Sequence, residues 1–204
     1  MHQVSADAAM ENSTHNVLPP TSQLARKPDA EILFLYRQGK QIHLENASQQ
    51  RLVSYQNTQT IKISFDFDVL IINARQLAGH TIIIHSLKNT GRSLQIEGRD
   101  IANISHILKA EDSGYLEWNQ DGLPEIHYQN IKQVMLNVHP QAEIHIEPPY
   151  AEAPTALGLT RYPGYLQLRS KTQQFPATLF QSGSKVTLFS PLQAEHTETV
   201  NRKP

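Results

Sequence analysis

Five histidines recur at intervals of 42, 21, 21 and 18 residues in short segments that combine histidine with isoleucine. They are His43, His85, His106, His127 and His145. Alternate residues of a β-strand face opposite sides, so the mostly apolar neighbours of these histidines predict that the imidazoles face outward. If the strands stack about 4.8 Å apart, the imidazoles form one surface row. Such a row can bind a transition metal, change charge near pH ~6.5, or simply stack on a solvated face.

The segment EIHIE is the densest group of potential metal ligands. Its polar residues, Glu143, His145 and Glu147, alternate with isoleucine, so we expect them on one face of one strand. The candidate metal ligands are therefore His85, His106, His127, Glu143, His145 and Glu147. Alternating charges are also common on solvated strand surfaces, and we expect no cofactor.

Two carboxylates in the segment SFDFDV, Asp66 and Asp68, are the candidates for catalysis. They alternate with Phe65, Phe67 and Val69, which we expect to face inward. Residues two apart on a strand lie about 7 Å from each other, which is compatible with the paired carboxylates of glycoside hydrolases. A carbohydrate-active β-helix enzyme is therefore one alternative, and a pair of solvated charges is the other. The sequence contains no GxSxG, Walker or HExxH motif.

The pair Gly91-Arg92, followed by Ser105 and a histidine, resembles the forkhead-associated domain, a β-sandwich that binds phosphothreonine peptides. The resemblance implies that Arg92 and Ser105 contact phosphate, and a guanidinium and a hydroxyl suit phosphate oxygens. Ser105 is adjacent to the histidine, without the two-residue gap of the family, and the later Asn-Gly dipeptide is missing. The alternative is that Gly91-Arg92 and Gly98-Arg99 are turns with solvated arginines.

The only tryptophan, Trp118, lies close to a turn in the segment SGYLEWNQDG. An exposed indole would be a stacking platform for a sugar, whereas a buried one would fill the core. The candidate ligand-binding residues are thus Arg92, Ser105 and Trp118.

The strand-like segments that contain the histidines recur with a regular period along the sequence. The intervals from His85 to His106 and from His106 to His127 are both 21 residues, and Ser64 occupies the same position one interval earlier. A second strand-like run and a turn follow each of these positions. A unit of strand, turn, strand and turn is typical of one coil of a β-solenoid, whose coils share one continuous core. About five coils of about 21 residues fit, and a β-sandwich or jelly roll with evenly spaced hairpins is the alternative.

The chain divides into four parts by composition. Residues 1–30 and 192–204 are polar, without apolar periodicity, and we expect them to be disordered. Residues 31–150 form the predicted solenoid or sandwich domain. A proline-rich break precedes 151–191, a small C-terminal β unit that, together with residues 32–36, is a plausible cap for the ends of the stack.

Composition excludes several classes of protein. With 18 basic and 19 acidic residues the net charge is −1, which argues against a nucleic-acid partner. No apolar run is long enough to span a membrane, and the N-terminus lacks the pattern of a signal peptide. The absence of cysteine excludes disulfides and thiol catalysis. The default expectation is a cytoplasmic protein, with export by a signal-less route left open.

These features favour a non-enzymatic structural, assembly or adhesion-type module that presents a polar β surface to protein or carbohydrate. Homo-oligomerisation is compatible with the open strand edges of a solenoid. The two alternatives are the phosphopeptide-binding sandwich and the carbohydrate-active β-helix enzyme.

Overall fold

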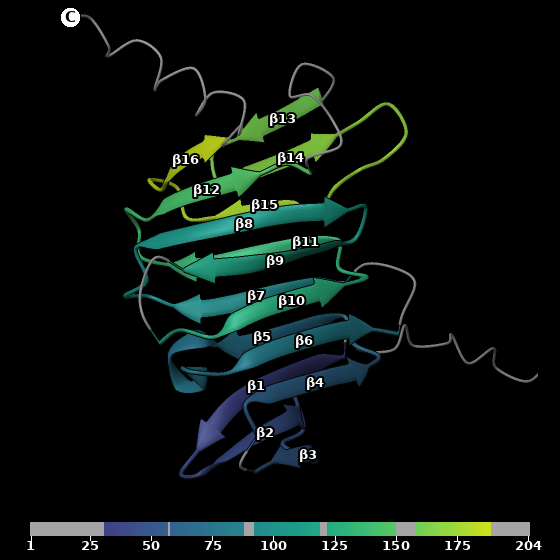
Figure 1. Cartoon of the computed structure of the whole chain (residues 1–204), viewed down its shortest axis with the longest axis vertical. Coiled ribbons are helices and arrows are strands. Elements are labelled where there is room, and N and C mark those ends of the chain that lie inside the picture. Colours follow the sequence, from purple (N-terminus) through teal and green to yellow (C-terminus); the bar gives the residue numbers. More distant parts are fainter. Residues whose placement is uncertain (1–30, 57, 88–91, 119–121, 150–157, 189–204) are drawn as a thin grey trace, which may run out of the picture.

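The computed structural model describes residues 31–56, 58–87, 92–118, 122–149 and 158–188. These residues form an all-β solenoid of about four turns, in which two sheets face each other (Figure 1). The predicted fold class is therefore confirmed, with about four turns in place of about five. The tails at 1–30 and 192–204 lie outside the described residues.

Within the described residues, sixteen strands make up the two sheets. The first sheet contains β1 (Ile32–Gln38), β2 (Gln41–Asn46), β3 (Arg51–Tyr55), β5 (Val69–Asn73), β7 (Ser93–Gly98), β11 (Gln133–Val138), β13 (Gly158–Tyr162), β14 (Tyr165–Arg169) and β15 (Ala177–Phe180). The second contains β4 (Thr60–Phe65), β6 (Thr81–Ser86), β8 (Asn103–Ala110), β9 (Ser113–Trp118), β10 (Glu125–Gln129), β12 (Glu143–Glu147) and β16 (Lys185–Leu188). The nine-stranded sheet has the order β13-β14-β15-β11-β7-β5-β1-β2-β3, and the seven-stranded sheet has the order β16-β12-β8-β9-β10-β6-β4.

A single 3-10 helix, η1 (Ala74–Leu77), is the only helical segment among the described residues. No helix in this described part of the chain has the length and apolar character needed to cross a membrane.

Each regular coil takes the chain from the seven-stranded sheet to the nine-stranded sheet. β4 leads to β5 and β6 leads to β7, so β4 pairs with β6 and β5 pairs with β7 in parallel. The register places Ile61 beside Ile82 and Leu70 beside Leu94, and all four side chains are fully buried. Because apolar and polar residues alternate along the strands, the inner faces of both sheets merge into one hydrophobic core.

The third coil departs from this pattern. Two strands, β9 and β10, separate β8 from β6, and β8 pairs in parallel with β12. β9 then turns back antiparallel to β8, and β10 turns again to lie antiparallel to β9 and parallel to β6. The sequence predicted identical coils, whereas the structure inserts this three-stranded meander into the seven-stranded sheet.

Both ends of the stack are built from strands of the same sheets. β1 to β3 form an antiparallel meander next to β5, and the Tyr55 hydroxyl of β3 donates a hydrogen bond to the Lys62 carbonyl of β4 at 2.9 Å. At the other end β15 pairs with β11 and β16 pairs with β12, both in parallel. The described strands of segment 151–191 therefore continue the two sheets of the solenoid.

Three polar side chains meet inside the core and connect the two sheets. They are His106 of β8, Tyr128 of β10 and Thr178 of β15, each at most 3% exposed. His106 Nε2 lies 2.5 Å from the Tyr128 hydroxyl, and His106 Nδ1 lies 2.7 Å from Thr178 Oγ1. Burial lowers the pKa of His106 to about 3 and raises the pKa of Tyr128 well above its usual value. The imidazole is therefore neutral, and it accepts with one nitrogen and donates from the other.

Candidate functional site

The five periodic histidines do not form one surface row, so that prediction is wrong. His85, His127 and His145 lie on the outer face of the seven-stranded sheet and are partly exposed. His106 of the same sheet points into the core. His43 lies on β2 of the other sheet, where it is 2% exposed and its Nδ1 is 3.0 Å from Ser54 Oγ.

The meander of the third coil explains the loss of the row. In the parallel pair of β6 and β10, His85 lies opposite Gln129, while His127 lies opposite Ile83. The predicted alignment of Ser64 with His85, in the regular coils, is confirmed. A strictly periodic sequence thus gives an aligned row only where the coils themselves are regular.

The predicted metal ligands do not form a metal site. Glu143, His145 and Glu147 do share the outer face of β12, as expected. Glu143 Oε1 lies 3.0 Å from Lys185 Nζ, and this hydrogen bond lowers the pKa of Glu143. Partial burial, aided by Glu117, raises the pKa of Glu147. No group of three or more His, Asp or Glu side chains that could hold a metal ion occurs within the described ranges.

The phosphate interpretation of Arg92 and Ser105 does not fit the structure. Arg92 is 2% exposed, and its Nη1 donates a hydrogen bond to the Asn130 carbonyl. Ser105 lies on the outer face of β8, in register with His145 and with Glu117 of β9. A phosphate clamp requires an accessible guanidinium, so the burial of Arg92 argues against one. The alternative that Arg92 is solvated is wrong as well.

Arg92 is instead a structural residue, and its replacement by alanine is expected to lower the free energy of unfolding by about 2 kcal/mol. The change removes the buried side-chain stem and the bond to Asn130. Urea unfolding measures the effect. Arg99→Ala, at the exposed arginine of the second Gly-Arg pair, is the matched control and should change stability by less than about 0.5 kcal/mol. Equal unfolding midpoints for the two variants would contradict this role.

The two candidate catalytic carboxylates lie in the loop between β4 and β5. Asp66 is exposed, and Phe67 between the two carboxylates is fully buried, as expected. Asp68 Oδ2 accepts a hydrogen bond from the Glu31 backbone N–H at 2.7 Å. This hydrogen bond links the residue before β1 to the loop between β4 and β5, so Asp68 has a structural role.

Trp118 packs against the hydrophobic core and is partly buried. Its Nε1 donates a hydrogen bond to the Pro124 carbonyl. Of the two alternatives for this indole, the structure therefore favours the core position over an exposed stacking platform.

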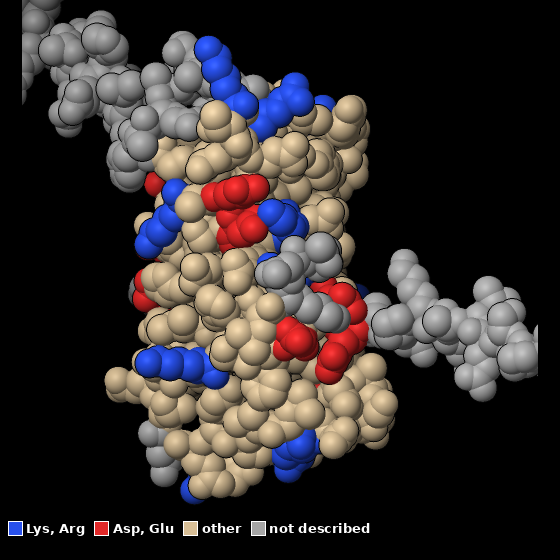
Figure 2. Space-filling model, turned by 90° about the vertical axis from the view of Figure 1, so that its right-hand side faces the viewer, with Lys and Arg blue, Asp and Glu red and all other residues tan. Residues whose placement is uncertain are grey.

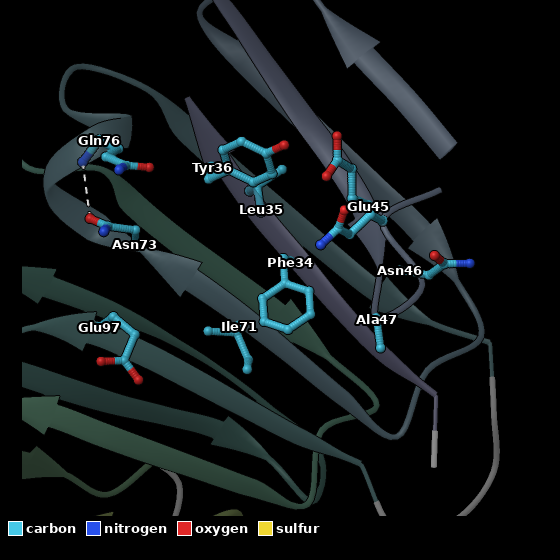
Figure 3. A pocket seen from close by; sticks show the side chains of 11 residues that line it. Phe34, Leu35, Tyr36, Glu45, Asn46, Ala47, Ile71, Asn73, Gln76 and Glu97 are labelled. Atoms are coloured by element: carbon cyan, nitrogen blue, oxygen red, sulfur yellow. Dashed lines mark hydrogen bonds between the residues drawn. The ribbon is translucent and has the colours of Figure 1, made fainter. Parts of the chain in front are cut away.

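A pocket that the sequence did not predict lies on the outer face of the nine-stranded sheet. Its volume is about 490 Å³, and β1, β2, β5, β7 and η1 contribute its walls. Phe34 of β1 and Ile71 of β5 are in register and lie side by side at its centre (Figure 3). Glu45 lies on one side of this apolar pair and Glu97 lies on the other side (Figure 3).

The carboxylates of the pocket are held in place by neighbouring side chains. Glu97 Oε1 accepts hydrogen bonds from Gln95 Nε2 at 2.6 Å and from Asn137 Nδ2 at 2.8 Å. A hydrogen bond from the Tyr36 hydroxyl and the nearby Arg51 guanidinium lower the pKa of Glu45. Both carboxylates are therefore held by neighbouring side chains in a position to accept hydrogen bonds.

The amides of the pocket are also positioned by the fold. Asn73 caps η1, and its Oδ1 accepts a hydrogen bond from the Gln76 backbone N–H at 3.3 Å (Figure 3). Gln76 Oε1 accepts one from the Arg37 backbone N–H at 3.2 Å. In both residues the carbonyl oxygen is engaged, which leaves the amide N–H groups available as donors.

The pocket continues into an uncharged row of side chains across the sheet. Phe34, Ile71, Gln95, Met135 and Leu179 occupy one row in register on five neighbouring strands. Among the outward-facing positions of β5, β7, β11 and β15, Glu97 is the only charged residue.

A signal for this pocket was present in the sequence. In ILFLYRQ the outward residues Phe34 and Tyr36 are as apolar or aromatic as the inward residues Leu33 and Leu35. A strand that is apolar on both faces is typical of a sheet with a second covered or binding surface.

The fold defines the chain as a member of the β-solenoid class of proteins. Beyond that class, no known family model, curated protein or solved structure matches the chain.

Proposed function

We propose that the protein is a non-enzymatic binding module that binds an uncharged carbohydrate in the pocket on the nine-stranded sheet. The main support is the arrangement of Phe34 and Ile71 between the carboxylates Glu45 and Glu97. Apolar side chains pack against the C–H faces of a sugar ring, and fixed carboxylates and amides bond its hydroxyl groups. The pocket supplies both kinds of contact within about 490 Å³.

The charges of the surface favour an uncharged ligand. The described residues that line the pocket include two carboxylates and neither Lys nor Arg, so the pocket would repel phosphate or sulfate groups. Figure 2 shows acidic and basic side chains interspersed among large uncharged areas on the edge of the molecule, without a broad patch of one sign. A protein partner for the same face is the alternative, but a hollow with convergent polar groups suits a small ligand better than a flat contact.

Phe34→Ala is expected to weaken sugar binding at least about tenfold, because it removes the apolar centre of the pocket, and tenfold corresponds to about 1.4 kcal/mol. An array of uncharged oligosaccharides, probed with the full chain, would identify a ligand for isothermal titration calorimetry. Phe34 is only partly buried and faces outward, so the variant should remain folded.

Tyr162→Ala is the matched control, because Tyr162 is an aromatic residue that is 63% exposed on β13, outside the pocket. It should leave the affinity unchanged. If Phe34→Ala and Tyr162→Ala bind the sugar equally well, or if no uncharged sugar binds at millimolar concentration, the proposal is wrong.

A further inference from the structure

A second hollow, on the opposite sheet, has different chemistry. It lies on the outer face of the seven-stranded sheet, where β8, β9, β10 and β6 are neighbours, and its volume is about 300 Å³. Its lining includes five side chains that can donate hydrogen bonds, namely His85, Lys109, Ser113, His127 and Gln129. Among the described residues, no carboxylate is part of this lining.

A β-bulge positions the cation of this hollow. The register of β8 and β9 shifts between Leu108 and Ala110, so Lys109 is the extra residue. Bulges of this kind redirect a side chain. Lys109 Nζ lies 4.4 Å from the centroid of the Tyr115 ring, and the Tyr115 ring stacks on His127 at 5.4 Å. The cation–π contact holds the ammonium over the sheet.

The amide of the hollow is oriented by a histidine. His85 Nε2 faces Asn130 Nδ2 at 3.4 Å and is the acceptor of that contact, so its Nδ1–H donates to Gln129 Oε1 at 3.2 Å. The carbonyl end of Gln129 is thereby engaged, and its N–H groups remain for a ligand. The Ser113 hydroxyl has no hydrogen-bond partner within the part of the chain that the structure describes.

We propose that this hollow binds an anionic oxygen group, a phosphate, sulfate or carboxylate, through the Lys109 ammonium, the Ser113 hydroxyl and the Gln129 amide. These three groups provide one positive charge and three kinds of donor around a space of about 300 Å³. Glu125 of β10 is engaged with His127 Nε2 at 2.7 Å and lies outside the lining.

The site is independent of the proposed carbohydrate pocket, because the two lie on opposite sheets and share no residue. Their charges are also opposite. The carboxylates of the first pocket are therefore expected to repel an anion that the second hollow binds.

The test uses nuclear magnetic resonance of the full chain, titrated separately with inorganic phosphate, glucuronate and uncharged glucose at constant pH and ionic strength. Phosphate, glucuronate or both should shift the resonances of the Ser113 and Gln129 amides, and glucose should not shift them. Lys109→Gln should weaken binding at least about fivefold, as expected for the loss of a charge-assisted hydrogen bond. Lys185→Gln, which removes the same charge from β16 at the end of the same sheet, should have no effect.

Binding of glucuronate that is tighter than that of phosphate would identify the anion as a group carried by a sugar acid, and the reverse order would identify a free oxyanion. Both orders support the site. Shifts that persist unchanged in Lys109→Gln, or the absence of shifts with both anions at about 20 mM, an excess far above the dissociation constant of a specific site, would overturn it.

Discussion

His106 by itself is expected to make the free energy of unfolding about 2–3 kcal/mol lower at pH 4.5 than at pH 7. The pKa of this imidazole is about 3 in the folded protein, against 6.5 in an unfolded chain. Between these two values the unfolded state binds a proton that the folded state cannot accept. The contribution of the neutral His106 to the free energy of unfolding is therefore fully present above about pH 6.5, and it decreases as the pH falls toward 3.

Urea unfolding at a series of pH values measures this effect. His106→Gln keeps a side chain that can both donate and accept a hydrogen bond, and it removes the titration. Its stability should therefore change by less than about 1 kcal/mol over the same range, although it should be less stable than the natural protein at pH 7. His85→Gln, on the outer face of the same sheet, should retain the full pH dependence. An unchanged pH dependence in His106→Gln would contradict the assignment.

Gly114→Ala is expected to lower the free energy of unfolding by about 3 kcal/mol or more. A Cβ at this position would lie closer than 3.0 Å to the Ile107 carbonyl oxygen and to the Tyr128 hydroxyl. The carbonyl belongs to the backbone of β8 and cannot rotate away. The hydroxyl is held by His106, so relief of the contact would break its hydrogen bond to the residue that also contacts Thr178 of the other sheet.

Two further variants separate this contact from a general effect of glycine replacement. Gly39→Ala meets no atom within 4 Å and should cost only about 1 kcal/mol, the strain of its positive φ. Tyr128→Phe removes the hydroxyl oxygen, which is one of the three atoms that would lie within 3.0 Å of the added Cβ. The destabilisation of the Gly114→Ala/Tyr128→Phe double variant should therefore be smaller than the sum of the single effects, as a double-mutant cycle from urea unfolding would show. Strict additivity would mean that the hydroxyl is not an obstacle.

The fold class was predictable because alternation and period are local properties of the chain. Runs such as TIKISF and SLQIEG show the isoleucine and leucine alternation that both sheets use, and the regular coils follow the predicted spacing. The meander of β8 to β10 was not predictable, since its strands look like the two strands of an ordinary coil. Which neighbour a strand pairs with depends on long-range packing that the pattern does not encode.

The orientation of His106 was nevertheless present in the sequence. Ile104 and Leu108, two positions to either side, are apolar, while the adjacent Ser105 is polar. Alternation therefore places His106 on the core side, and the regular interval of 21 residues was the weaker guide.

The burial of Arg92, by contrast, could not be predicted from the sequence. A charged residue after a glycine has the pattern of a solvated turn, and only the fold reveals that another loop, at Asn130, covers it. The carbohydrate pocket was missed for a related reason, because its residues come from four strands and a 3-10 helix that are separated in the sequence.

The meander also has a consequence for the order in which the chain folds. β6 receives its second neighbour only when β10 is present, and the paired residues His85 and Gln129 are 44 positions apart. During synthesis from the ribosome, one edge of β6 therefore remains unpaired until the whole meander has emerged. The stack cannot grow coil by coil past this point, so the closure of the third coil is expected to be the slow, aggregation-sensitive step of folding.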